Sequence, residues 1–169
     1  MNGFSLLRGS LFGLLALGLS ACQTGGSGSV SGAGVPIAVE TLEGAPAEMS
    51  ARVQQAVTTQ ASAHNIDVVP RESDPRFRLR GYLTAYATDD GTALTFVWDV
   101  FDSSRHRAQR VTATTVSSRK AGEEPWSSIS DADIANAASK SMDGVAQFLA
   151  AARAGSSNAQ EGRSACHLM

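Results

Sequence analysis

The sequence predicts an α+β fold: a single small domain in which two helices lie on one face of a mixed, mostly antiparallel sheet. Three observations support this prediction. The length of 169 residues favours one domain with extensions. A central stretch alternates apolar and polar residues, which is typical of half-buried strands. Two alanine-rich segments with apolar residues at helical spacing flank that stretch. The expected order of elements is β-α-β-β-β-β-α, within residues 35–154.

The amino-terminal part of this domain is expected to hold two short strands and a helix. Val35–Thr41 forms the first strand. The helix follows from Pro46 and ends near Asn65, a residue type that tolerates the left-handed conformation at a helix end. Ile66–Val69 forms the second strand. Because a helix separates the two strands, we expect them to be parallel, with a right-handed crossover.

The clearest pattern in the chain is a β-hairpin. Apolar residues alternate with polar ones on both sides of Asp90-Gly91, which is a type I′ turn signal. A two-residue turn at that position pairs Leu83 with Trp98. A longer loop would shift the pairing by two residues and leave the faces unchanged. A third antiparallel strand is expected around Ala108–Val116. The apolar face of the hairpin comprises Phe77, Leu79, Gly81, Leu83, Ala85, Leu94, Phe96, Trp98 and Val100.

The last element is a helix that begins after Ser130. Ser130 and Asp133 have the spacing of a capping box, with aspartate in place of the usual glutamate or glutamine. Gly155 is expected to end the helix as a C′ glycine, and residues 155–169 are predicted to be a disordered tail. The apolar face of this helix comprises Ile134, Ala138, Met142, Val145, Leu149 and Ala152.

The first 21 residues have the features of a secretory signal peptide. Arg8 precedes the nine-residue apolar run Leu11–Leu19, which is too short to cross about 30 Å of hydrocarbon. The following Leu19-Ser20-Ala21-Cys22 resembles the lipobox of bacterial lipoproteins. That resemblance implies that Cys22 carries the lipid and becomes the mature amino terminus. The alternative is an ordinary signal peptidase site in which Cys22 is an incidental small residue.

Residues 22–34 link this cysteine to the domain. After Cys22 they are almost wholly glycine, serine and small polar residues, a composition that gives a flexible tether. Gln23 occupies the position where proteobacterial lipoproteins kept in the inner membrane usually have aspartate. The resemblance therefore implies a lipid-anchored protein of the outer membrane, facing the periplasm, in a Gram-negative host.

The domain also resembles a known group of proteins, through the segment RLRGYLTAYATDDGTALTFVWDVFD and through Gly81, Trp98-Asp99 and Pro125-Trp126. It looks like small envelope lipoproteins of alphaproteobacteria. It is similar in type to the amino-terminal domain of the Tol-Pal propeller protein and to lipoprotein activators of cell-wall synthases. The resemblance implies two helices over one face of a mixed sheet, and a role in binding proteins rather than in catalysis.

The composition argues against several classes of function. A net charge of -2 and a pI near 5.9 give no bulk attraction to nucleic acid. Two cysteines far apart in the chain form neither a zinc site nor a disulfide framework. The three histidines fall at a helix end, a turn and the carboxyl-terminal tail, so we expect no catalytic group, no metal and no cofactor.

One surface stands out as a candidate binding site, on the sheet face opposite the apolar one. Arginine and tyrosine, the residue types that concentrate binding energy at interfaces, gather there. The alternative is an ordinary solvated sheet face, in which Arg80 stacks on Phe101 and Asp99 pairs diagonally with Arg110. The candidate binding residues are Arg76, Arg78, Arg80, Tyr82 and Tyr86.

These features together predict a non-enzymatic outer-membrane lipoprotein. It would present the α+β domain to a periplasmic protein partner in envelope assembly or maintenance. The alternative is a binder of an anionic envelope polymer, such as lipopolysaccharide or a glycan, through the arginines of the sheet face.

Lipidation of Cys22 can be tested directly. We expect the mature protein to begin at Cys22 and to carry acyl chains there, since each buried methylene contributes about 0.8 kcal/mol of membrane affinity. Mass spectrometry of the purified protein and of Cys22→Ser checks this. An unmodified wild-type chain free in the periplasm would refute the lipoprotein assignment.

Overall fold

The computed structural model describes residues 34–166, with side chains through residue 156. The predicted signal peptide, Cys22 and most of the tether lie outside the described residues. The elements are β1 (Pro36–Glu43), α1 (Ala47–Ala63), β2 (Asp67–Val68), β3 (Phe77–Thr88), β4 (Gly91–Phe101), β5 (Arg107–Ser117), a 3₁₀ turn (Pro125–Ser128) and α2 (Asp131–Cys166).

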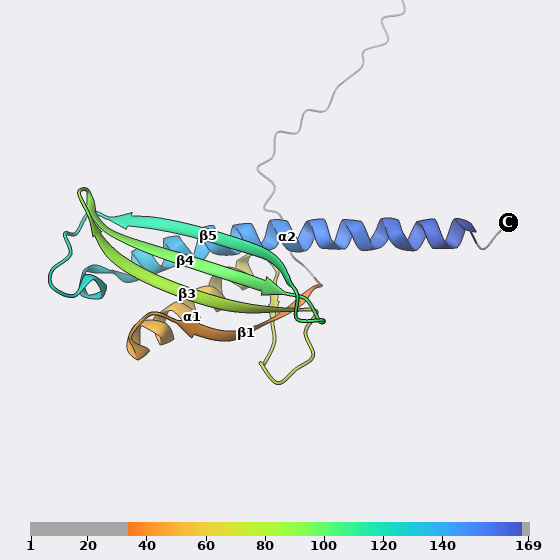
Figure 1. Cartoon of the computed structure of the whole chain (residues 1–169), viewed down its shortest axis with the longest axis horizontal. Helices are drawn as coiled ribbons and strands as arrows, with labels where there is room; N and C mark the ends of the chain where they lie inside the picture. Colours follow the sequence, from red (N-terminus) through yellow and green to blue (C-terminus); the bar gives the residue numbers. More distant parts are fainter. Residues whose placement is uncertain (1–33, 167–169) are drawn as a thin grey trace, which may run out of the picture.

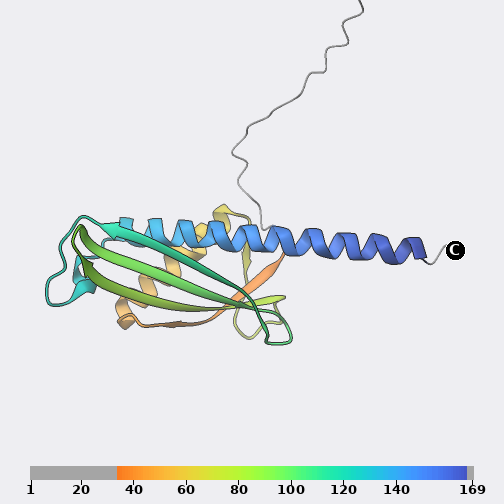
Figure 2. The same cartoon turned by 45° about the horizontal axis from the view of Figure 1, so that its top comes forward.

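The strands form one five-stranded sheet in the order β2-β1-β3-β4-β5. β1 is parallel to β2 and β3, whereas β3, β4 and β5 form an antiparallel meander. Both helices lie on the same face of this curled sheet (Figures 1 and 2). The predicted α+β class, the order of elements and the parallel pairing of the first two strands are therefore confirmed. Among the described residues, no helix has the length and apolar character needed to cross a bilayer.

The end of α1 has the predicted conformation. Asn65 has a φ of 53°, in the left-handed region that asparagine tolerates better than most residues. The next residue, Ile66, is buried and donates its backbone N–H to the carbonyl oxygen of Ala61 at 2.9 Å. This tight turn directs the chain from α1 into β2.

The faces of the β3–β4 hairpin agree with the prediction, but the register differs by two residues. Asp89 and Asp90 form the turn, and Gly81 rather than Leu83 lies opposite Trp98. Of the two registers considered, the one with Asp90-Gly91 as the turn is therefore wrong, and the one shifted by two residues is observed. Because the shift is an even number of residues, every apolar side chain stays on the core face.

Gly91 explains the difference in register, because it belongs to β4 and lies against β5 instead of forming the turn. It is the first residue of β4 and has a φ of 150°. A Cβ at this position would collide with the backbone carbonyl oxygen of Ser117 in β5. The glycine therefore permits a close approach of β5. The sequence of the hairpin alone does not indicate this contact, because Ser117 belongs to another strand.

Trp98 lies at the centre of the core. It is fully buried, and its ring packs edge-on to that of Phe96 with centroids 6.4 Å apart. The six-membered ring of Trp98 lies over Gly81, where a Cβ would come within 2.7 Å of it and 2.6 Å of Leu42 Cδ2. Glycine at position 81 is therefore required by the indole that lies across it.

The start of α2 confirms the predicted capping box. Ser130 donates its backbone N–H to an Asp133 carboxylate oxygen at 2.9 Å, and Asp133 N–H points to the Ser130 hydroxyl at 3.3 Å. The predicted apolar face is also confirmed: Ile134, Ala138, Met142, Val145 and Leu149 are buried, and Ala152 is partly buried.

The end of α2 contradicts the prediction. The helix does not stop at Gly155 but continues to Cys166, so residues 155–166 are helical rather than a disordered tail. A glycine inside a helix costs only about 1 kcal/mol relative to alanine, and no proline follows it to interrupt the backbone hydrogen bonds. The 36 residues of α2 span about 54 Å, and the helix extends beyond the domain (Figure 1).

The burial of Trp98 leads to a stability prediction. Trp98→Ala should lower the free energy of unfolding by about 3–5 kcal/mol, because it removes a large ring from a packed core. Chemical denaturation followed by circular dichroism measures this loss. Thr112→Ala, on the exposed face of β5, serves as a control and should change the stability by about 0.5 kcal/mol or less. Equal losses for the two variants would contradict the core assignment.

Candidate functional site

The candidate site lies on the open face of the sheet, opposite the two helices. Cross-strand rows run over β3, β4 and β5 on this face, and the row of Tyr86, Ala93 and Val116 lies near the β3–β4 turn. The side chains of Tyr86 and Val116 are 46% and 51% exposed, which is high for large apolar residues. A second row places Tyr82 beside Val97. This face therefore has two apolar rows toward one end, one with Tyr82 and Val97 and one with Tyr86 and Val116. A row of three threonines, Thr84, Thr95 and Thr114, lies between them.

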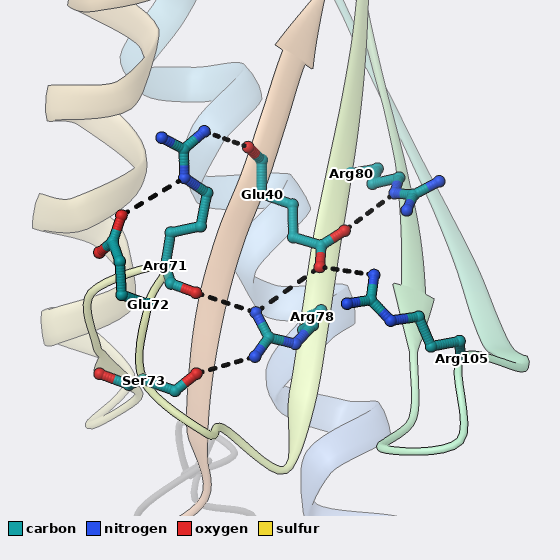
Figure 3. Close-up of polar contacts among 7 residues, drawn as sticks. All are labelled: Glu40, Arg71, Glu72, Ser73, Arg78, Arg80 and Arg105. Carbon is teal, nitrogen blue, oxygen red and sulfur yellow. Dashed lines mark hydrogen bonds and ion pairs between the residues drawn. The ribbon is translucent and has the colours of Figure 1, made fainter.

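The other end of the face carries arginines, and Arg78 is the most enclosed of them, with a side chain only 18% exposed. Its guanidinium donates to the backbone carbonyl oxygens of Arg71 at 3.0 Å and Ser73 at 2.8 Å (Figure 3). It also lies 3.6 Å from a carboxylate oxygen of Glu40. Arg78 thus holds the loop between β2 and β3 against the sheet, which is a structural role.

Glu40 is the centre of this arginine cluster, and no pattern in the sequence indicates that role. Its carboxylate lies 3.0 Å from Arg80 Nε and 3.4 Å from Arg105, in addition to its contact with Arg78 (Figure 3). The Glu40 side chain is 12% exposed. Three guanidinium groups from two distant segments therefore gather around one nearly buried carboxylate.

A β-bulge brings Glu40 to this position. β1 pairs with β3 in regular register up to Val39, and pairing resumes at Thr41, so that Glu40 is the extra residue. A bulge re-aims the side chain of the residue it inserts. The sequence VPIAVET contains no glycine or other turn signal that would have predicted the bulge.

The contact between Arg80 and Phe101, expected for an ordinary sheet face, is confirmed. The guanidinium carbon of Arg80 lies 4.9 Å above the centre of the Phe101 ring, a cation–π geometry. Since Nε of the same guanidinium donates to Glu40, Arg80 is fixed by one aromatic and one ionic partner.

Asp99 forms the second ionic centre on this face. Arg110 donates to both of its carboxylate oxygens at 2.7 Å, and Arg107 lies 3.7 Å away. The hydrogen bonds from Arg110 lower the pKa of Asp99 below its ordinary value of 3.8, against the opposing effect of burial. The expected pairing of Asp99 with Arg110 is confirmed, although the two residues lie directly opposite each other rather than on a diagonal.

Arg76 does not belong to the arginine cluster, and the prediction that it shares this face is wrong. It precedes the first residue of β3, so strand alternation does not fix the direction of its side chain. Its guanidinium instead reaches α2, where it donates to the Ser156 hydroxyl at 2.8 Å. The same group lies 5.4 Å from the Phe77 ring, which packs against Phe148 of α2.

The open face carries an excess of positive charge. Five arginines and three carboxylates lie there, which leaves a formal charge of about +2 before solvent screening. The residues counted are Arg78, Arg80, Arg105, Arg107 and Arg110 against Glu40, Asp99 and Glu43, which β1 places opposite Tyr82. Among the described residues, no three histidine, cysteine or acidic side chains gather in a metal-binding arrangement.

The lowered pKa of Asp99 predicts a pH-dependent contribution to stability. Asp99→Asn should lose about 1–2 kcal/mol at pH 7, a modest amount because Arg110 is half-exposed. A depressed pKa stabilises the fold above 3.8, and this gain disappears as the pH falls through the lowered value. The gap between wild type and variant should therefore shrink as the pH falls below 3.8.

Urea unfolding at a series of pH values measures this gap. Asp74→Asn is the matched control, because Asp74 is exposed in the loop between β2 and β3 and its replacement should matter little at any pH. A gap for Asp99→Asn that stays constant from pH 7 down to the acid unfolding of the wild type would contradict the assignment.

No family model and no curated protein matches this chain. Among solved structures, it is similar to the PelC dodecamer from Paraburkholderia phytofirmans, at 15% identity and a TM-score of 0.44 over 68% of this chain and 91% of that one.

Two further solved structures are described as lipoproteins. A minor lipoprotein from Acinetobacter baumannii shows 12% identity and a TM-score of 0.42 over 70% of this chain and 94% of its own. A candidate lipoprotein from Caulobacter crescentus shows 14% identity and a TM-score of 0.40 over 71% and 91%. These values describe a partial likeness in fold and assign no function to this chain. The resemblance to the Tol-Pal propeller domain and to the synthase activators stays a prediction.

Proposed function

We propose that this protein is a non-enzymatic lipoprotein of the outer membrane, which presents its α+β domain to a periplasmic protein partner in envelope assembly or maintenance. The anchor and the tether are supported by the sequence of residues 1–34. The flexible composition of the tether would allow the domain to reach away from the membrane surface.

The composition of the open sheet face carries this proposal. Tyr86 and Val116 lie exposed in one cross-strand row, and the arginines of the same face lie beyond Tyr82 and Val97. Aromatic residues and arginine are enriched in protein interfaces, where an apolar centre is surrounded by polar groups. A partner with an apolar patch beside an acidic one would match this face.

The alternative, an anionic envelope polymer, finds less support in this geometry. Arg78, Arg80 and Arg110 already donate to groups of this chain, so binding of a polyanion would compete with those contacts. A polyanion also has no need of the exposed tyrosine and valine. Salt dependence separates the two, because binding of a polyanion weakens steeply with ionic strength, whereas a largely apolar interface does not.

Photocrosslinking in living cells tests the proposal. A photoreactive amino acid at Thr114, beside the apolar row, should capture a discrete protein, whereas the same group at Ser62 on the exposed side of α1 should not. The double variant Tyr86→Ser and Val116→Ser should melt like wild type and lose the crosslink, since exposed side chains contribute little to folding.

Two results would contradict the proposal. One is a crosslink to polysaccharide or lipopolysaccharide from Thr114, which would favour the anionic polymer. The other is a double variant that keeps both its crosslink and its envelope phenotype, which would make this face an ordinary solvated surface.

A further inference from the structure

The edge of the sheet at β1 is only partly covered by β2. Their pairing is limited to Pro36 and Ile37, followed by one hydrogen bond from Val69 N–H to the Ile37 carbonyl oxygen at 2.8 Å. From Ala38 to Glu43, the side of β1 away from β3 pairs with no strand among the described residues. This free edge is about 20 Å long, given a rise of roughly 3.3 Å per residue.

A groove of about 760 Å³ runs along this free edge. Its apolar part comes from Val39, Leu42 and Ala45, which are partly buried and pack against the core. Ala51 and Gln54 of α1 are exposed and line its helical side. A strand edge beside an apolar groove offers backbone hydrogen bonds and space for alternate side chains, which are the two requirements for strand addition.

Arg71 supplies a polar contact at this edge. Its guanidinium lies 3.5 Å from the backbone carbonyl oxygen of Glu40, at the outer limit of a hydrogen bond, and its side chain is 66% exposed (Figure 3). The loop that carries Arg71 is held independently, by the hydrogen bonds from Arg78 to the carbonyl oxygens of Arg71 and Ser73. The backbone N–H of an added strand could therefore replace the Arg71 side chain without releasing the loop.

Arg71 is the basic side chain of the groove. The other charged residues that line it are Glu40 and Glu72, and the Glu40 carboxylate is already paired with arginines of the open face. Displacement of Arg71 from the Glu40 carbonyl oxygen would turn its guanidinium, which lies 3.7 Å from Glu72, toward the incoming segment. The complementary segment is therefore extended, with a carboxylate opposite Arg71.

We propose that the free edge of β1 accepts an extended segment of a partner protein as an additional strand, with its apolar side chains in the groove beside α1 and a carboxylate opposite Arg71. This surface is separate from the apolar row on the open sheet face, and the proposal depends neither on that row nor on the lipid anchor. Lysine-rich or proline-containing edges block strand addition in many proteins. The Ala38–Glu43 edge contains neither lysine nor proline.

A synthetic peptide tests this proposal on the full-length protein in detergent. The probe is a blocked heptapeptide of alternating valine and threonine with a central glutamate, and its matched partner has lysine at the centre. We expect saturable binding of the glutamate peptide, roughly two- to fivefold tighter than the lysine peptide. Backbone amides within residues 38–43 should become protected from hydrogen exchange. Methylation of alternate peptide nitrogens should abolish binding, because strand addition uses backbone hydrogen bonds.

Variants localise the binding. Ala51→Trp fills the groove from an exposed helical position and should weaken peptide binding about tenfold or more, as should Gln54→Trp. Ala63→Trp introduces the same side chain at an exposed position of α1 that does not line the groove, and it should bind like wild type. Arg71→Ala should remove most of the preference for glutamate over lysine.

Three results would overturn the proposal: no saturable binding, no protection within residues 38–43, or equal binding by Ala51→Trp and Ala63→Trp. None of them bears on crosslinking from Thr114, so failure of this proposal and failure of the proposed function are distinguishable. A wild type that binds both peptides equally would overturn the acidic preference.

Discussion

The two helices cover only one face of the sheet, and the rest of the structure follows from that constraint. Alternation along β3, β4 and β5 places Phe96 and Trp98 in the core, and it leaves the side chains of the opposite face without a second layer. Arginines provide a partial cover on that side. Arg80 lies over Phe101, and the side chain of Asp99 is only 5% exposed beside Arg107 and Arg110. Long arginine stems cover apolar surface while their charged groups stay near water.

This cover requires carboxylates beneath the arginines, since neighbouring guanidinium groups repel one another. Asp99 meets the requirement through ordinary register, because β4 places it directly opposite Arg80 and Arg110. Glu40 meets it through an irregularity, the bulge in β1. The bulge costs one position of sheet pairing, and in return it places a carboxylate within 3.6 Å of three arginines from β3 and the β4–β5 turn. The irregular residue is thus the one that joins the sheet edge to the charged face.

The sequence predicted those features that depend on local periodicity, and it failed where a contact comes from a distant segment. The faces of the hairpin follow from a period of two, so they are unaffected by the register. The register itself depends on the approach of Ser117 to Gly91, a contact between different strands. The helical cap at Ser130 is local and was predicted correctly. Gly155 has the local features of a helix end, yet packing that extends to Ala152 and the absence of proline allow α2 to continue.

In the candidate site too, strand alternation predicted some residues correctly, whereas others depend on contacts with distant segments. Arg78, Arg80, Tyr82 and Tyr86 alternate within β3, and the strand places them on the open face as expected. Arg76 lies one residue before the strand begins, where alternation no longer applies, and α2 provides its partners. Glu40 could not be identified, because a bulge without a glycine has no signature in a single sequence. Its three partners lie 38, 40 and 65 residues further along the chain.

Glu40 also explains how the two proposed surfaces can operate together. Its carboxylate oxygens contact Arg78, Arg80 and Arg105 on the open face, whereas its backbone carbonyl oxygen faces Arg71 in the groove. An added strand would use the carbonyl oxygen alone, so the ion pairs of the carboxylate would remain. The loop between β2 and β3 would stay in place, because Arg78 holds it to the cluster independently of the Arg71 side chain. Occupation of the edge therefore leaves the charged face intact, and both surfaces are available to one partner or to two.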